Sequence, residues 1–273
     1  MRVCVAGASG WIGYTAPSTA DAQDAHERME RASHYWRDWL AGGRFPDHRY
    51  RSYLQRSALK GLTYAPTGAT VAAATTSLSE TLGGERNWDY RCCWMRDATF
   101  TLWGLHALGL DSEADDFMQF VADLERNDDG ALQIMYGVGG ERHLTERELE
   151  ELTGYEHSQP VRAGNGAFQQ RQNDVFGAVL DSVYLHSKVG GHIPQRLWPV
   201  PSDQVARACD VWEEPDQGIW EARGEPKHSE RGVFRQHYDT DALDASTLLI
   251  PLVRFLPASD ERVRKSCRRV PTS

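Results

Sequence analysis

The chain has 273 residues, of which 25% are charged and 10% aromatic, a composition typical of a globular protein and not of a disordered one. Its formal net charge of −9 at pH 7 argues against nucleic acid or an anionic membrane as a partner, because phosphate binding depends on clustered Lys and Arg. No apolar run approaches the roughly 20 residues that span a bilayer, and MRVCVAGASG holds too short an apolar segment for a signal peptide.

Five cysteines include the adjacent pair Cys92 and Cys93. An odd total without regular spacing forms neither a disulfide framework nor a CxxC metal site. We therefore expect reduced cysteines, a cytoplasmic location, no metal or other cofactor, and a small neutral or weakly basic molecule as the partner.

The first residues, 1–13, read as a short buried strand entering a glycine turn. Their GASGWIG is similar to the nucleotide-binding turn of extended short-chain dehydrogenases and epimerases. That motif requires a helix after the turn and a second strand that ends in an acidic residue. Residues 14–24 contain Pro17 and no amphipathic pattern, so we interpret residues 1–20 as an extension without a dinucleotide site. An NAD-dependent epimerase is the weaker alternative.

Apolar residues at three- and four-residue steps predict most of the remaining elements. Helices are expected over 21–40 and 50–63, from Ala98, from a cap at Asp111 or Ser112 to Leu124, and over 146–152, 165–188, 194–212 and 241–255. A long irregular loop is expected over 64–88 and a brief strand within 128–140. A capping box of Thr145 and Glu148 should open the helix at 146, and Pro199 and Pro201 should interrupt the one at 194. About seven or eight helices with little strand make the class all-α.

The stretch 83–110, GGERNWDYRCCWMRDATFTLWGLHALGL, places Arg96 and Asp97 at the mouth of an apolar helix. A buried charge pair is costly unless it is matched, so these groups need each other or a ligand rich in hydroxyls. A sugar is such a ligand, because its hydroxyls bond to both groups while its C–H face lies on an indole such as Trp94. An intramolecular pair that caps the helix is equally compatible with the sequence.

A second candidate is GIWEARGEP, residues 218–226. Glu221 follows an indole in a glycine-flanked loop, where apolar burial raises a carboxyl pKa as a general acid requires. The alternative is one more exposed acid in an acidic loop.

Five segments in order resemble the catalytic domain of glycoside hydrolase family 15, the glucoamylases and bacterial trehalases. They are RNWDYRCCWMRDATFTLWGLHALG, LQIMYGVGGERHL, NGAFQQRQNDVFGAVLDSVYLH, PDQGIWEARGEP and DALDASTLLIPLVRFLP. The order and spacing match from about residue 33 to residue 265, and the sequence is most similar to the actinobacterial trehalase branch.

The resemblance implies an (α/α)6 toroid, here incomplete, over residues 21–273. It also implies inverting hydrolysis of an α-glucosidic bond, with α,α-trehalose as the expected substrate. The residues it assigns are Glu221 as general acid, Arg96 and Asp97 as the hydroxyl clamp, Trp94 and Trp220 as pocket walls, and Arg223 as a substrate contact. Removal of the Asp97 carboxylate is expected to leave Arg96 unpaired.

Three departures from the family pattern affect this expectation. Members of the family usually have a β-sandwich domain before this region, where we expect only the short extension of residues 1–20. They usually carry a further helical pair where His228 here runs almost directly into Glu230, and their catalytic base lies in an EGTF-like motif that these 273 residues do not contain. We therefore expect very low turnover. The alternatives are glucoamylase-type release of glucose from starch-like glucans, and a non-catalytic or vestigial sugar-binding fragment.

Overall fold

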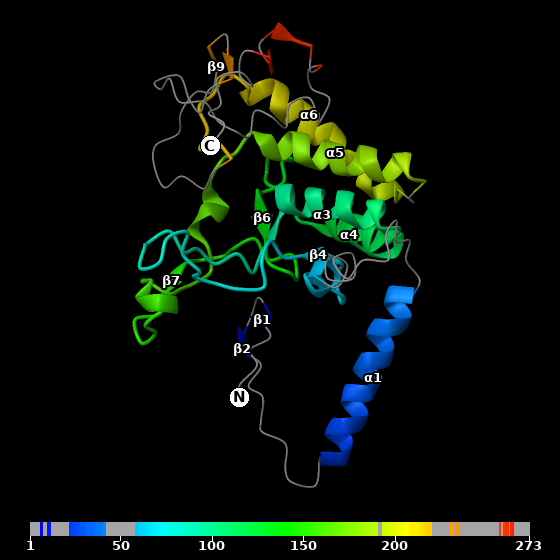
Figure 1. Cartoon of the computed structure of the whole chain (residues 1–273). Helices are drawn as coiled ribbons and strands as arrows, with labels where there is room; N and C mark the ends of the chain where they lie inside the picture. The colour runs from blue at the N-terminus through cyan, green and yellow to red at the C-terminus, as the bar shows by residue number, and fades with distance from the viewer. Residues whose placement is uncertain are drawn as a thin grey trace.

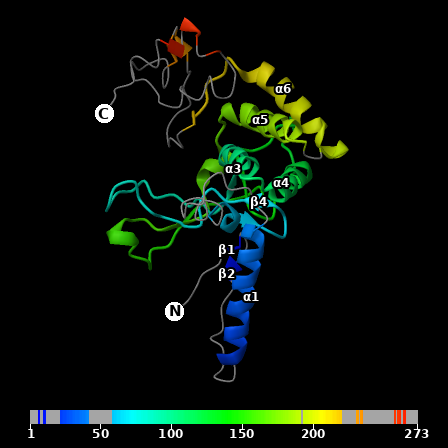
Figure 2. The ribbon, with the colours of Figure 1, turned by 45° about the vertical axis from the view of Figure 1, so that its right-hand side comes forward.

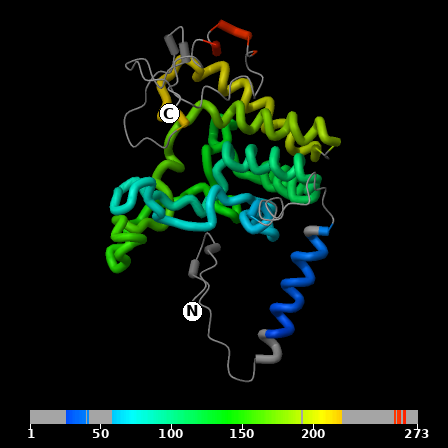
Figure 3. The backbone as a smooth tube through the Cα atoms, viewed as in Figure 1, coloured from blue at the N-terminus to red at the C-terminus, as the bar shows by residue number. Residues whose placement is uncertain are grey.

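The structure is a computed structural model of the chain. It describes residues 22–41, 58–190 and 193–219, with short pieces at 6–7, 10–11, 230–231, 233–234, 257, 259–261 and 263–264. Figure 3 traces the chain with residues 58–190, residues 193–219 and most of residues 22–41 in colour. The helix expected over 241–255 lies outside the described residues, and of the one expected over 50–63 the structure describes a helical end at 58–61.

The described part is built mainly of helices. These are α1 (Ala22–Ala41), α3 (Met95–Ala107), α4 (Asp111–Asp123), α5 (Asp174–Lys188) and α6 (Pro199–Val211), with short 3-10 turns at Tyr155–His157, Gly166–Gln169 and Gln195–Leu197. Helix α3 packs against α4 and α5, and α5 packs against α6, so the helices stack in layers (Figures 1 and 2). The expected helix at 21–40 and the α3–α4 hairpin are confirmed. None of the described helices combines the length and apolar character that a membrane span requires.

All the described strands have two residues, and each pairs antiparallel with one other strand. The pairs are β1 (Ala6–Gly7) with β2 (Gly10–Trp11), β3 (Thr63–Tyr64) with β4 (Ala69–Thr70), β5 (Cys93–Trp94) with β6 (Met135–Tyr136), β7 (Arg147–Glu148) with β8 (Arg162–Ala163), and β9 (Glu230–Arg231) with β10 (Val233–Phe234). Around the glycine turn near the start of the chain, the described residues thus form a small hairpin in place of the single strand expected there.

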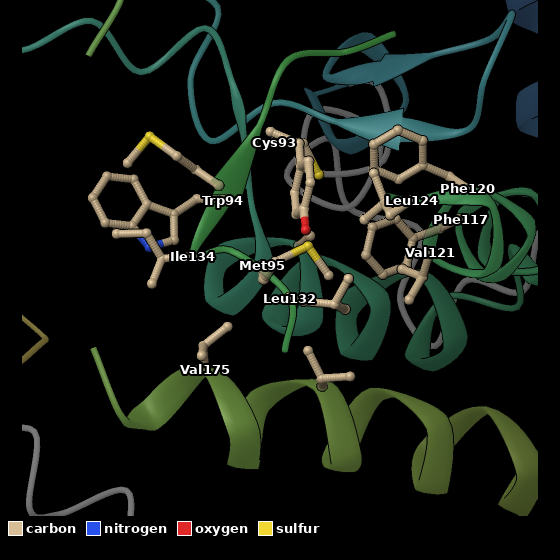
Figure 4. Packing of buried hydrophobic residues seen from close by; sticks show 14 of the residues in the cluster. Cys93, Trp94, Met95, Phe117, Phe120, Val121, Leu124, Leu132, Ile134 and Val175 are labelled. Carbon is tan, nitrogen blue, oxygen red and sulfur yellow. The ribbon is translucent and has the colours of Figure 1, made fainter. Parts of the chain in front are cut away.

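The core lies between α3, α4, α5 and the β5–β6 pair. Figure 4 shows Phe117, Phe120 and Val121 of α4 on one side of it, Cys93 of β5 beside them, and Val175 of α5 on another side. Because these apolar side chains are almost fully removed from water, they hold the first turn of α3 and the first turn of α5 in fixed positions.

Helix α3 begins at Met95, three residues before the expected Ala98. The backbone N–H of Met95 donates to the carbonyl of Ile134 at 2.9 Å, so the β5–β6 pairing runs directly into the helix. The expected cap of α4 at Asp111 or Ser112 is wrong. Leu110 is the residue before the helix, and it makes no side-chain cap bond.

The helix expected over 146–152 is also wrong, because residues 147–148 form strand β7. A capping box is a local signal, and here the long-range pairing with β8 outweighs it. Gly164 follows β8 at a φ of +80°, and a Cβ there would collide with the Thr145 carbonyl. Only glycine permits the backbone at residue 164 to approach the backbone at Thr145 so closely.

Helices α5 and α6 begin later than expected. The polar run before Asp174 is an irregular segment preceded by a 3-10 turn, and the Asn165 side chain accepts from the Ala167 N–H at 2.9 Å to open that turn. Pro199 and Pro201 start α6 and do not interrupt it, since proline lacks only an N–H that the first turn of a helix leaves unpaired.

Candidate active site

The N-terminal ends of α3 and α5 lie side by side, and the segment 214–219 that follows α6 returns to meet them. Helix α3 contributes Arg96 from its first turn, and α5 contributes Asp174 as its first residue. Helix N-termini carry unpaired N–H groups and a partial positive charge, so acidic side chains are favourable there.

Arg96 is the centre of this region. Its Nη1 donates to Asp174 Oδ2 at 2.6 Å and to Gln172 Oε1 at 3.2 Å, and its Nη2 donates to the backbone carbonyl of Ile219 at 2.8 Å. The Arg96 side chain is 17% exposed. One guanidinium therefore links α3, the residues before α5, and the segment after α6.

Trp94 lies beneath this guanidinium. The Arg96 Cζ is 5.4 Å from the centroid of the indole, a cation–π distance, and the Tyr90 ring centroid is 6.1 Å from it. Trp94 is 3% exposed and pairs with Met135 in the β5–β6 ladder. In this structure the indole supports Arg96 from the core side.

Asp97 is exposed and does not form the ion pair with Arg96. Desolvation by the surrounding chain raises the pKa of its carboxyl, while the nearby Arg96 charge lowers it and Asp174 raises it further. The expectation that removal of Asp97 leaves Arg96 unpaired is wrong, because Asp174 is the hydrogen-bonded partner.

Asp174 and Gln172 were not singled out as site residues in the sequence. Gln172 is 1% exposed, and its Nε2 donates to Gln170 Oε1 at 3.0 Å, which orients its own oxygen toward Arg96. The Oδ1 of Asp174 is buried and has no hydrogen-bond donor among the described residues. The one available signal was the polar run QQRQND immediately before an apolar helix.

The segment 214–219 is held on residues 171–173 by a series of bonds. Arg171 and Gln217 exchange two bonds at 3.0 Å, and the Arg171 guanidinium also reaches the Glu214 carboxylate and the Pro215 carbonyl. Asp216 accepts from the Asn173 N–H at 2.7 Å and from the Gly218 N–H at 3.1 Å.

Burial raises the pKa of Asp216, while the Asn173 and Gly218 N–H bonds lower it. Asp174 raises this pKa further and the Arg171 charge lowers it, so the charge of Asp174 acts on both Asp97 and Asp216. Among the described residues, no group of three His, Cys, Asp or Glu side chains has the arrangement that would hold a metal ion.

Trp220, Glu221 and Arg223 lie outside the described residues. Their roles in the site stay predictions.

Arg96, the carboxylates of Asp97 and Asp174 and the Trp94 indole lie together at the N-terminal ends of α3 and α5, and the sequence comparison gives the family. The profile of Glycosyl hydrolases family 15 matches residues 48–237, so the chain belongs to that family. Membership and the mostly helical structure together confirm the expected all-α class of the (α/α)6 type.

Three curated relatives are each named trehalase. The one from Mycolicibacterium smegmatis is 50% identical over 309 aligned positions, covering 94% of this chain and 46% of the relative. The one from Mycobacterium tuberculosis is 48% identical, covering 95% and 45%. The one from Thermoplasma acidophilum is 31% identical, covering 89% and 50%. The chain thus spans about half the length of the relatives it matches.

The first of these alignments has more positions than this chain has residues. That relative therefore carries residues inside the aligned region that have no counterpart here. The expected gap between His228 and Glu230 stays a prediction.

Proposed function

We propose that this chain is part of an inverting α-glucoside hydrolase whose substrate is α,α-trehalose. The observation that carries the proposal is 50% identity to a protein named trehalase over 94% of this chain. Residues 21–273 are assigned to the helical catalytic domain and residues 1–20 to an extension outside it. The family match at 48–237 supports this division.

In the proposed reaction Glu221 donates its proton to the glycosidic oxygen as the bond from that oxygen to the anomeric carbon breaks. A water molecule attacks the same carbon from the opposite face and gives up a proton to a second carboxylate. The two products are glucose molecules, and the one that water attacks has the β configuration.

The other residues bind the sugar. Arg96 and Asp97 hold hydroxyls of the terminal glucose, Trp94 and Trp220 form the walls, and Arg223 contacts the substrate. The link from Arg96 to the Ile219 carbonyl supports this assignment, because it ties the clamp to the segment that leads to the acid. The raised pKa of Asp97 also fits a carboxyl whose surroundings are more favourable once it is bonded to a ligand.

No residue of these 273 is assigned to the base, because none stands in the family's base motif. Without a base, water is not activated, and general catalysis of this kind contributes about 10²- to 10⁴-fold. We therefore expect the purified chain to bind trehalose and to hydrolyse it very slowly.

The test is calorimetry with trehalose, maltose and NAD, followed by an NMR assay of the anomers released from trehalose. Trehalose should bind more tightly than maltose, NAD should not bind, and slow turnover should yield β-glucose first. Glu221→Gln should abolish the remaining turnover and leave binding intact. Preference for maltose would favour a glucoamylase, and binding of no sugar would contradict the proposal.

A further inference from the structure

Besides its proposed bonds to sugar hydroxyls, Arg96 makes hydrogen bonds within the protein, and these indicate a second role. Three of its N–H groups are directed to protein acceptors, namely Asp174, Gln172 and the Ile219 carbonyl. A sugar clamp needs donors directed at the ligand. These bonds instead join α3 to α5 and to the segment after α6.

The carbonyl that Arg96 holds belongs to the residue two positions before Glu221. The residues before Ile219 are fixed by the two bonds between Arg171 and Gln217. The Asn173 and Gly218 N–H groups also donate to the Asp216 carboxylate. The Arg96 bond is the last described contact of this segment along the chain. It therefore sets the point from which the chain continues to the proton donor.

The direction of the Arg96 guanidinium depends on Asp174. An arginine side chain has many rotamers, and a charge-assisted hydrogen bond of 2.6 Å to a carboxylate that is itself fixed at a helix N-terminus selects one of them. The Asp174 side chain is 26% exposed, so the ion pair with Arg96 is partly shielded from water. Such a bond is stronger there than at the surface of the protein.

We propose that Asp174 is a positioning residue that acts through Arg96: it fixes the Ile219 carbonyl and so places the general acid. This inference rests on the proposed role of Glu221. Its physical basis is that acid catalysis requires hydrogen-bond geometry, and a misplacement of about 1 Å can cost about 10²-fold in rate.

The test compares Asp174→Ala and Asp174→Asn with Asp203→Ala as a matched control. Asp203 forms an ion pair of 2.7 Å with Arg126, which joins the segment after α4 to α6 and has no contact with Arg96. Asp174→Asn keeps an acceptor for Arg96 and serves if the alanine variant does not fold. Glu221→Gln is the reference for loss of the acid.

The first readout is hydrogen exchange at the amides of residues 216–219, which does not depend on turnover. Loss of a bond to a charged group should speed this exchange about tenfold in Asp174→Ala and less in Asp174→Asn, with no change in Asp203→Ala. Unchanged exchange in Asp174→Ala would overturn the proposal that Asp174 holds residues 216–219 in place through Arg96, whatever the activity of the variant.

The second readout compares trehalose with α-glucosyl fluoride, whose leaving group departs as fluoride ion and needs little protonation. Asp174→Ala should lose about 10²-fold in kcat on trehalose, change KM by less than about threefold, and keep its rate on the fluoride, as we also expect of Glu221→Gln. Equal losses on both substrates would show an effect on binding or folding and would contradict positioning. If the wild-type chain turns over neither substrate, the proposed function fails. Hydrogen exchange alone then decides whether Asp174 holds residues 216–219 in place.

Discussion

Asp97 and Asp174 stand on either side of Arg96, and the structure gives them different tasks. Asp174 forms the ion pair, whereas Asp97 is exposed with a raised pKa caused first by desolvation. A carboxyl whose pKa is higher in the folded state holds its proton more tightly there. The stability that it contributes therefore falls as the pH rises from the unfolded value through the folded value.

We predict that Asp97→Asn weakens trehalose binding by about tenfold or more, because a hydrogen bond to a charged group is lost. The same change should not lower the melting temperature at pH 7 and should raise it slightly, since an unfavourable charge is removed. The stability difference should shrink below about pH 4 and vanish near about pH 3, where the wild-type carboxyl is mostly protonated in both states.

Calorimetric titration and thermal unfolding at pH 3 to 8 would check this prediction. Asp123→Asn is a suitable control, because Asp123 pairs with Arg196 at the surface, away from Arg96. A large loss of stability in Asp97→Asn at pH 7, with sugar affinity unchanged, would mean that Asp97 has a structural role and no binding role.

At the scale of elements, α1 is the least integrated of the described helices. It extends away from the other helices (Figures 1 and 2), and Met29 and Tyr35 on it are exposed. One of its contacts with the rest of the protein is the hydrogen bond from Trp39 Nε1 to Glu113 Oε1 at 2.7 Å, and the same oxygen accepts from Lys60 Nζ at 2.7 Å. Glu113 is 3% exposed, so this carboxylate joins α1, the helical residues 58–61 and α4 inside the protein.

Burial alone would raise the pKa of Glu113, but the hydrogen bonds from Lys60, Trp39 and Ser112 outweigh it and lower the pKa. The stabilisation is therefore complete above the ordinary value and is lost as the pH falls through the lowered one. We predict that Glu113→Ala costs about 3 kcal/mol in the free energy of unfolding at pH 7, because Lys60 is left buried without its partner.

Chemical denaturation at several pH values would measure this cost. Glu27→Ala is the matched control, since Glu27 forms an exposed i,i+4 pair with Arg31 on α1 and should cost no more than about 0.5 kcal/mol. A cost for Glu113→Ala that did not shrink in acid would show that the charge of Glu113 is not what stabilises the contact.

At the scale of the whole molecule, the class of fold and the family were predictable from the sequence. Helical periodicity gave α1, α3 and α4, and the five segments in order identified the family that the profile match confirms. Local signals failed where long-range contacts decide the structure. The pairing of β7 with β8 outweighs the local signal of the capping box at Thr145. Helix α5 begins at Asp174, whose side chain accepts a hydrogen bond from Arg96, 78 positions away in the sequence.

The site was predictable in part for the same reason. Arg96 and Asp97 stood out because charges are unusual beside an apolar helix. The bonds of Arg96 to Asp174 and Ile219 join residues 78 and 123 positions apart, and no local pattern encodes such a contact. Buried Gln172 was missed because polar runs before helices are common on protein surfaces.

The proposed function requires Arg96, Asp97 and Glu221 to lie around one glucose-sized site. An experimental structure of the chain with trehalose bound tests this most directly. We predict one glucose ring in contact with Arg96 and Asp97, and a Glu221 carboxyl oxygen about 2.6–3.2 Å from the glycosidic oxygen. Trehalose bound elsewhere, or Glu221 on another face from Arg96 and Asp97, would contradict it.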